Sequence, residues 1–124
     1  MDFPEHFDWI GECLKCSLEG AFVKLRETVD SDIKRWNYLR PDVRVVLDPS
    51  FGPDKFVVNI PYVPAAAVFE ISRENRRIEI RRGSGPLLSA KPEVCPDGQC
   101  RLRFNGELLR FWQISQKALG DLLL

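Results

Sequence analysis

Four cysteines in two pairs are the residues of this sequence whose type and spacing come closest to a chemical motif. Two residues separate Cys13 from Cys16, and four separate Cys95 from Cys100. Four thiolates are one ligand set of a structural zinc site, and a Cys-x-x-Cys pair at the start of a helix is a redox motif. Both interpretations are disfavoured because Cys13 and Cys16 fall in the middle of a predicted helix, without a glycine turn beside them.

Two further states remain open for these cysteines. Cys95 and Cys100 flank a turn at 96–99, so they would form a cross-strand disulfide in an oxidised protein. The favoured interpretation is four reduced thiols that act as small buried hydrophobic residues.

The first residues are acidic where a signal peptide would be basic, and no apolar run approaches the roughly 20 residues of a membrane span. The sequence therefore predicts a cytoplasmic protein with reduced thiols, no metal and no cofactor.

Few residues in this chain could act as a general acid or base. His6 is the only histidine, and it lies beside Glu5 in a segment expected at the surface. Glu70 and Glu79 are expected to face each other across a hairpin, but arginines beside them would keep both ionised and make them poor general acids. The glycines at 83–86 lack the following helix and lysine of a phosphate-binding loop. We therefore expect a protein that is not an enzyme.

Arginines gather in the second half of the chain, on two predicted hairpins. If these hairpins are neighbours, one outer face of the sheet would carry Arg77, Arg81, Arg101, Arg103, Arg110 and Trp112. Such a face could bind nucleic acid through phosphate contacts and stacking. However, glutamates are interleaved, and sheet-type RNA binders use two or three aromatic residues. A solvated face of cross-strand ion pairs is favoured, followed by a protein or acidic partner and then by nucleic acid.

The elements that would position these residues begin with one long helix in the first third of the chain. Apolar residues recur at steps of three and four and define one stripe: Phe7, Ile10, Leu14, Leu18, Phe22, Leu25, Val29, Ile33 and Trp36. A straight helix over residues 4–39 would be about 54 Å long, whereas a domain of this size is roughly 35 Å across. We therefore expect the helix to bend at 17–20, near Gly20, or to project beyond the domain.

A second apolar stripe lies nearly opposite the first, over the N-terminal half of this helix only. Its members are Trp9, Cys13, Cys16, Gly20 and Val23. A helix that is apolar on two faces is normally covered by two layers. The C-terminal helix of the same chain, a protein partner or a second copy of the chain would each supply the second layer.

The remaining sequence predicts strands joined by short turns. Strands are expected at 43–48 and 55–60, and Pro61 and Pro64 place 61–64 at an edge or crossover. A hairpin over 68–82, turning at Glu74-Asn75, would pair the two apolar sets Phe69–Ile80 and Ile71–Ile78. The segment 83–91 is expected as a loop.

The C-terminal part of the chain contains the strongest turn signal. Asn105-Gly106 predicts a second hairpin that pairs Leu102 with Leu109 and Cys100 with Phe111. Ser115 is then expected to cap a short last helix over 116–123.

Together these patterns predict one α+β domain over residues 1–124. A long N-terminal helix, kinked near Gly20, would pack on an antiparallel sheet of about six strands formed by hairpins, followed by a short C-terminal helix. Hydrophobic residues at 44% and charged residues at 29% are typical of a globular protein. Equal numbers of basic and acidic residues, 18 of each, predict neither nucleic acid nor an anionic membrane as a partner.

The function predicted from these features is a small protein-interaction module that is not an enzyme. It would self-associate, as a homodimer, or bind another protein, through the second helix stripe or the arginine-rich sheet face. Nucleic-acid binding by the sheet face is the first alternative. The second is a carrier that holds a small apolar ligand between helix and sheet, in a pocket lined by Phe56, Phe69, Phe104 and Phe111.

Overall fold

The computed structural model of the chain describes residues 9–61, 63–83, 85 and 87–123. In chain order its elements are α1 (Trp9–Lys15), α2 (Leu18–Leu39), β1 (Val46–Asp48), β2 (Lys55–Ile60), β3 (Val63–Ser72), β4 (Arg77–Arg82), β5 (Leu88–Val94), β6 (Cys100–Phe104), β7 (Glu107–Leu109) and α3 (Phe111–Leu123). The predicted α+β class is confirmed, with seven strands instead of about six.

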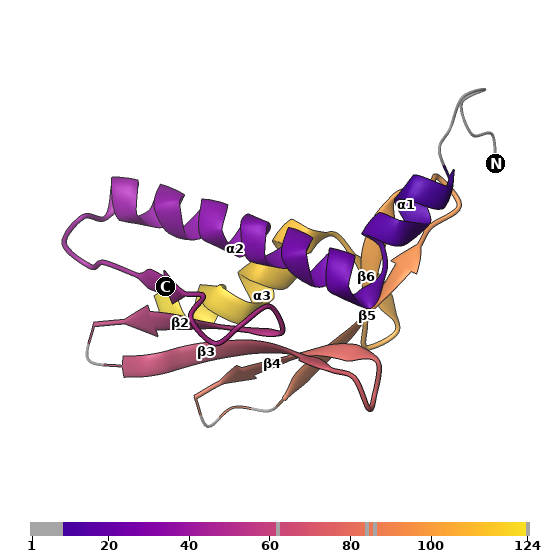
Figure 1. Cartoon of the computed structure of the whole chain (residues 1–124). Helices are drawn as coiled ribbons and strands as arrows, with labels where there is room; N and C mark the ends of the chain where they lie inside the picture. Colours follow the sequence, from indigo (N-terminus) through magenta and orange to yellow (C-terminus); the bar gives the residue numbers. More distant parts are fainter. Residues whose placement is uncertain (1–8, 62, 84, 86, 124) are drawn as a thin grey trace.

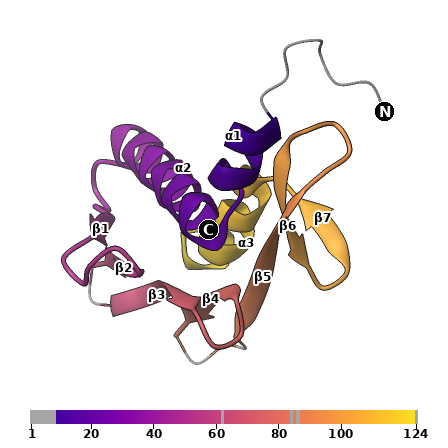
Figure 2. The same ribbon diagram turned by 45° about the vertical axis from the view of Figure 1, so that its right-hand side comes forward.

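Each strand pairs antiparallel with the next one along the chain, so the sheet order is β1-β2-β3-β4-β5-β6-β7. The sheet curls, and α2 and α3 lie side by side against its concave face (Figures 1 and 2). α1 lies apart from them, next to β6 (Figure 1). Local pairing throughout means that every strand is positioned by a turn or loop close to it in sequence.

The predicted long helix is broken into α1 and α2 at Cys16 and Ser17. Ser17 has an extended backbone and caps α2, because its Oγ accepts a hydrogen bond of 3.0 Å from the N–H of Gly20. A Cβ on Gly20 would lie 2.6 Å from the carbonyl oxygen of Lys15, so glycine permits the end of α1 to touch the first turn of α2. The predicted kink near Gly20 is therefore confirmed.

The break also divides the apolar stripe. The stripe is buried in α2, at Phe22, Leu25, Val29 and Ile33. In α1, however, Ile10 is 55% exposed and Leu14 is 68% exposed. The prediction of one continuous stripe is wrong for α1, because the cap at Ser17 starts a new helix with its own direction. Phe7 lies outside the described residues.

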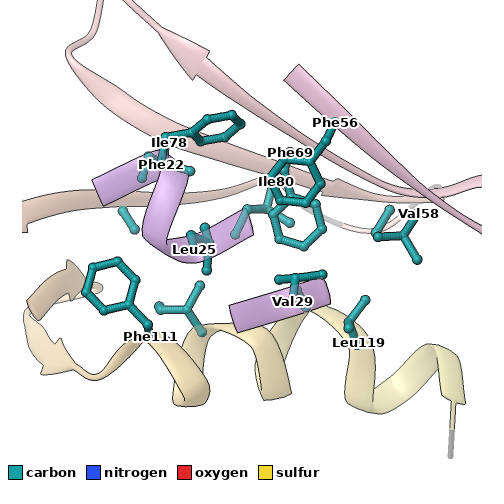
Figure 3. Close-up of a cluster of buried hydrophobic side chains, with 14 of the residues drawn as sticks. Phe22, Leu25, Val29, Phe56, Val58, Phe69, Ile78, Ile80, Phe111 and Leu119 are labelled. Atoms are coloured by element: carbon teal, nitrogen blue, oxygen red, sulfur yellow. The ribbon is translucent and has the colours of Figure 1, made fainter. Parts of the chain in front are cut away.

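The core fills the space between the helices and the concave face of the sheet. Phe22 of α2 contacts Phe56 of β2 with ring centroids 5.2 Å apart, and Phe56 stacks on Phe69 of β3 at 4.5 Å. Figure 3 shows Phe111 and Leu119 of α3 reaching the same cluster from the opposite side. Phe56 and Phe69, two of the four residues predicted to line a ligand pocket, are fully buried in this core.

Both predicted hairpin registers are confirmed at their centres. Phe69 pairs with Ile80 and Ile71 with Ile78 between β3 and β4, and Leu102 pairs with Leu109 between β6 and β7. In the second hairpin, Asn105 has φ 48° and Gly106 has φ 82°, the two positive values that a type I′ turn requires.

One predicted pairing fails. Cys100 is paired with Val94 of β5, while Phe111 is already the first residue of α3. The chain leaves the sheet after Leu109, two residues sooner than the alternating pattern suggested.

β5 is the strand that the sequence did not predict, since its residues fall largely in a segment expected as a loop. Its first half pairs with β4, up to Ile78 opposite Ala90, and its second half pairs with β6. Pro92 lies opposite Leu102, beyond the last pair with β4, so its missing N–H removes no bond between β4 and β5. Pro64 likewise stands at the start of β3, before pairing with β4 begins at Ala67.

The contact at Gly20 gives a test of the helix break. Gly20→Ala should destabilise the protein by about 1–3 kcal/mol, because the added methyl group would collide with backbone carbonyls. Gly120→Ala in α3 is the matched control: a Cβ there meets nothing within 4 Å, so the change should stabilise by about 0.5–1 kcal/mol. Denaturant-induced unfolding measures both, and a Gly20→Ala protein as stable as the native one would contradict the close approach.

Candidate functional site

A disulfide joins the helix break to the sheet. Cys16, between α1 and α2, is bonded to Cys100, the first residue of β6, with the two Cα atoms 5.4 Å apart. The prediction that all four cysteines are reduced thiols is therefore wrong. The bond pairs residues 84 positions apart, so no local spacing in the sequence could indicate it.

The alternative disulfide between Cys95 and Cys100 is also contradicted. Cys100 is bonded to Cys16, and Cys95, which directly follows β5, is a free cysteine. Its thiol is buried and contacts the guanidinium of Arg101. Cys13 is the second free cysteine, and it is exposed on α1.

The second helix stripe has two different roles. Cys16 and Gly20 hold the fold, through the disulfide and the close helix approach. Cys13 and Val23 are exposed, and the side chain of Trp9 lies outside the described part of the chain. The stripe borders an open hollow of about 490 Å³ lined by Lys15, Gly20, Val23, Lys24, Glu27 and Cys100.

The predicted arginine-rich face is only partly assembled. Arg77 and Arg81 project from the outer face of β4, and Arg101 and Arg103 project from the outer face of β6, opposite the buried Ile78, Ile80 and Leu102. Arg110 lies in the link between β7 and α3, and Trp112 lies on α3. Their predicted place on the sheet face is wrong, because the chain turns into a helix there.

Most arginines of this face are paired with carboxylates. Arg103 donates two hydrogen bonds to Glu93, at 2.7 and 3.2 Å. Arg101 does the same to Asp97, at 3.1 and 2.8 Å. These hydrogen bonds hold the pKa of each carboxyl below its ordinary value. The face therefore presents ion pairs and no continuous positive surface, which weakens the argument for phosphate binding.

A different surface collects exposed aromatic side chains between α2 and α3. We name it the tryptophan cleft: an opening of about 350 Å³ lined by Asp32, Trp36, Trp112, Ser115, Gln116, Leu119, Gly120 and Leu123. Trp112 is 54% exposed. Trp36 is half-buried and fixed in place, because its Nε1–H donates to the carbonyl oxygen of Val43 at 3.1 Å.

One polar contact crosses between the two helices in this cleft. The hydroxyl of Ser115 donates to Oδ2 of Asp32 at 2.6 Å. Ser115 is a buried residue within α3, so its predicted role as the N-cap of a helix starting at 116 is wrong. Among the described lysines and arginines, none forms an ion pair with Asp32.

The cleft combines residues that sequence reasoning did not bring together. Asp32 and Trp36 are four positions apart on α2, and Trp112 and Ser115 are three apart on α3, so each pair shares one helix face. The cleft follows only from the packing of α2 on α3. A carboxylate beside two indole rings is a chemical environment that attracts a cation.

Comparisons with known proteins give no relative to argue from. Neither a protein-family model, nor a curated protein, nor a solved structure matches this chain. Within the described residues, no helix is long and apolar enough to cross a membrane, and no three His, Cys, Asp or Glu side chains gather into a potential metal site.

The ion pairs of the outer face predict a pH dependence. Because pairing with Arg103 lowers the pKa of Glu93 in the folded protein, the stabilisation is complete above the ordinary value of 4.5 and is lost as the pH falls through the lowered pKa. In acid, Arg103→Gln should therefore lose less stability than the native protein does. Thermal unfolding between about pH 5 and pH 3 measures this.

Arg77→Gln is the control for this measurement, because Arg77 lies on the same face and forms none of the described ion pairs. Its acid sensitivity should match that of the native protein. If Arg103→Gln also followed the native curve, the Glu93–Arg103 pair would have no stabilising role.

Proposed function

We propose that this protein is a non-enzymatic interaction module that binds another protein by receiving a basic side chain in the tryptophan cleft. The observation that carries the proposal is that the exposed Trp112 lines one cleft together with Trp36 and Asp32. Tryptophan is among the residues that contribute most to binding energy at protein interfaces. A tryptophan that is more than half exposed is consistent with a surface to be covered by a partner.

The chemistry of the cleft favours an arginine or lysine of the partner. Leu119 and Leu123 provide apolar walls for the aliphatic part of such a side chain. The guanidinium of Arg40 already lies 5.6 Å from the ring centroid of Trp36, so the exposed Trp112 is the indole on which a planar guanidinium of the partner would stack. Asp32 then supplies the opposite charge, since its only described partner is the Ser115 hydroxyl.

The surface around the cleft supports a protein partner over a small molecule. Leu39 lies seven positions after Asp32 on the same face of α2 and is 58% exposed. Apolar surface therefore continues past the cleft to the end of α2, further than one side chain would cover. The hollow at Gly20 and Val23 is a separate surface of the same molecule.

Nucleic-acid binding, the alternative from the sequence, has weaker support. Arg81 and Arg103 are paired with carboxylates of neighbouring strands, and Arg101 is paired with Asp97 in the turn before β6. Phosphate binding would have to replace these contacts. Self-association remains a distinguishable outcome, in which a second copy provides the basic side chain.

A library of peptides with arginine, glutamate or alanine at a fixed central position tests this proposal. The native protein should retain arginine peptides preferentially. Trp112→Ala and Asp32→Asn should each weaken this binding about tenfold or more, while Arg77→Ala on the sheet face should not. Equal retention of the three peptide classes, or unchanged binding by Trp112→Ala, would overturn the proposal.

Size-exclusion chromatography with light scattering distinguishes a foreign protein partner from a second copy of this chain. A monomer for both the native protein and Trp112→Ala indicates a foreign partner. A native dimer that Trp112→Ala converts to a monomer would make the partner a second copy. A dimer that persists in Trp112→Ala would show that self-association uses a different surface.

A further inference from the structure

We propose that Cys13, Cys16 and Cys100 form an intramolecular thiol–disulfide exchange site. In this site the exposed Cys13 displaces Cys100 from Cys16, so that the covalent link between α1 and the sheet is opened without any external oxidant or reductant. The proposal is independent of the tryptophan cleft, which lies between α2 and α3. It rests on the positions of one disulfide and two free thiols.

Cys16 lies within disulfide reach of two partners. Its present partner Cys100 has its Cα 5.4 Å away. Cys13 is three positions earlier, in helix α1, which places its Cα about 5 Å from that of Cys16 by helix geometry. Both separations fall in the range of about 4.4–6.8 Å that disulfides adopt. Cys16 directly follows the last residue of α1, so Cys13 is less than one helical turn away from it along the chain.

The second free thiol is not a competing nucleophile. Cys95 is buried against Arg101. Cys13, in contrast, is exposed to solvent. The exchange site therefore has one nucleophile, one central sulfur and one leaving group.

The step conserves atoms and electrons. The Cys13 thiolate attacks Sγ of Cys16, the Cys13–Cys16 bond forms and the Cys16–Cys100 bond breaks. Cys100 leaves as a thiolate and takes up a proton, which replaces the proton that Cys13 released. One disulfide and two free thiols are present before and after the step.

The exchange changes what the disulfide holds together. The Cys16–Cys100 bond spans 84 residues and attaches the helix break to β6, whereas a Cys13–Cys16 bond would lie within the first helical segment. Cys100 lines the hollow beside Gly20 and Val23. Its release would leave a free thiol in that hollow and remove the covalent restraint on α1.

The test maps disulfides in the native protein over time. Protein kept at acidic pH and then moved to about pH 8.5 is incubated for increasing periods, quenched in acid, alkylated and digested for mass spectrometry. Peptides with a Cys13–Cys16 disulfide and alkylated Cys100 should accumulate at a rate that is independent of protein concentration. Because the thiolate is the attacking species in disulfide exchange, the rate should fall as the pH is lowered.

Two variants make the outcome decisive. Cys13→Ser should abolish alkylation of Cys100, and Cys95→Ser should leave it unchanged. Constant protection of Cys100 in the native protein at all times would overturn the proposal, as would alkylation of Cys100 that persists in Cys13→Ser.

A third variant tests the geometry without relying on the native disulfide. In Cys100→Ser, oxidised glutathione should produce an internal Cys13–Cys16 disulfide that is lighter by two hydrogens. If Cys13 and Cys16 accumulated separate glutathione adducts instead, the two sulfurs would not be in reach of each other.

Discussion

The covalent bond between Cys16 and Cys100 is the constraint on which the arrangement of this protein depends. It joins Cys16, where the N-terminal helix breaks, to Cys100, the first residue of β6. The cap at Ser17 and the close approach at Gly20 let the chain change direction there, and α2 can then lie along the concave face of the sheet. Cross-linking residues far apart in sequence restricts the unfolded chain most.

The two candidate surfaces are consequences of this arrangement. α3 packs beside α2 through buried apolar residues of the shared core, and this packing places Trp36 and Trp112 at one cleft. At the other end of α2, a hollow is bordered by α1, α2 and β6. The outer face of the sheet differs from both surfaces, because Arg101 and Arg103 on it form ion pairs with carboxylates.

The sequence predicted local features well and distant ones poorly. The β3–β4 register followed from matching apolar sets, and the Asn105-Gly106 turn followed from its residue types. β5 was missed because the glycine-rich stretch at 83–86 indicates a loop, whereas the chain after it pairs first with β4 and then with β6. The cysteine pairing and the tryptophan cleft could not be predicted, since both join residues that only the tertiary fold brings together.

The most direct test of this account is the free energy of unfolding, measured by denaturant with and without a reducing agent. If the Cys16–Cys100 bond organises the fold, reduction should lower that free energy by about 2–4 kcal/mol, and Cys16→Ser should lower it equally without reductant. Identical unfolding curves for the oxidised and reduced protein would contradict the central role of this disulfide.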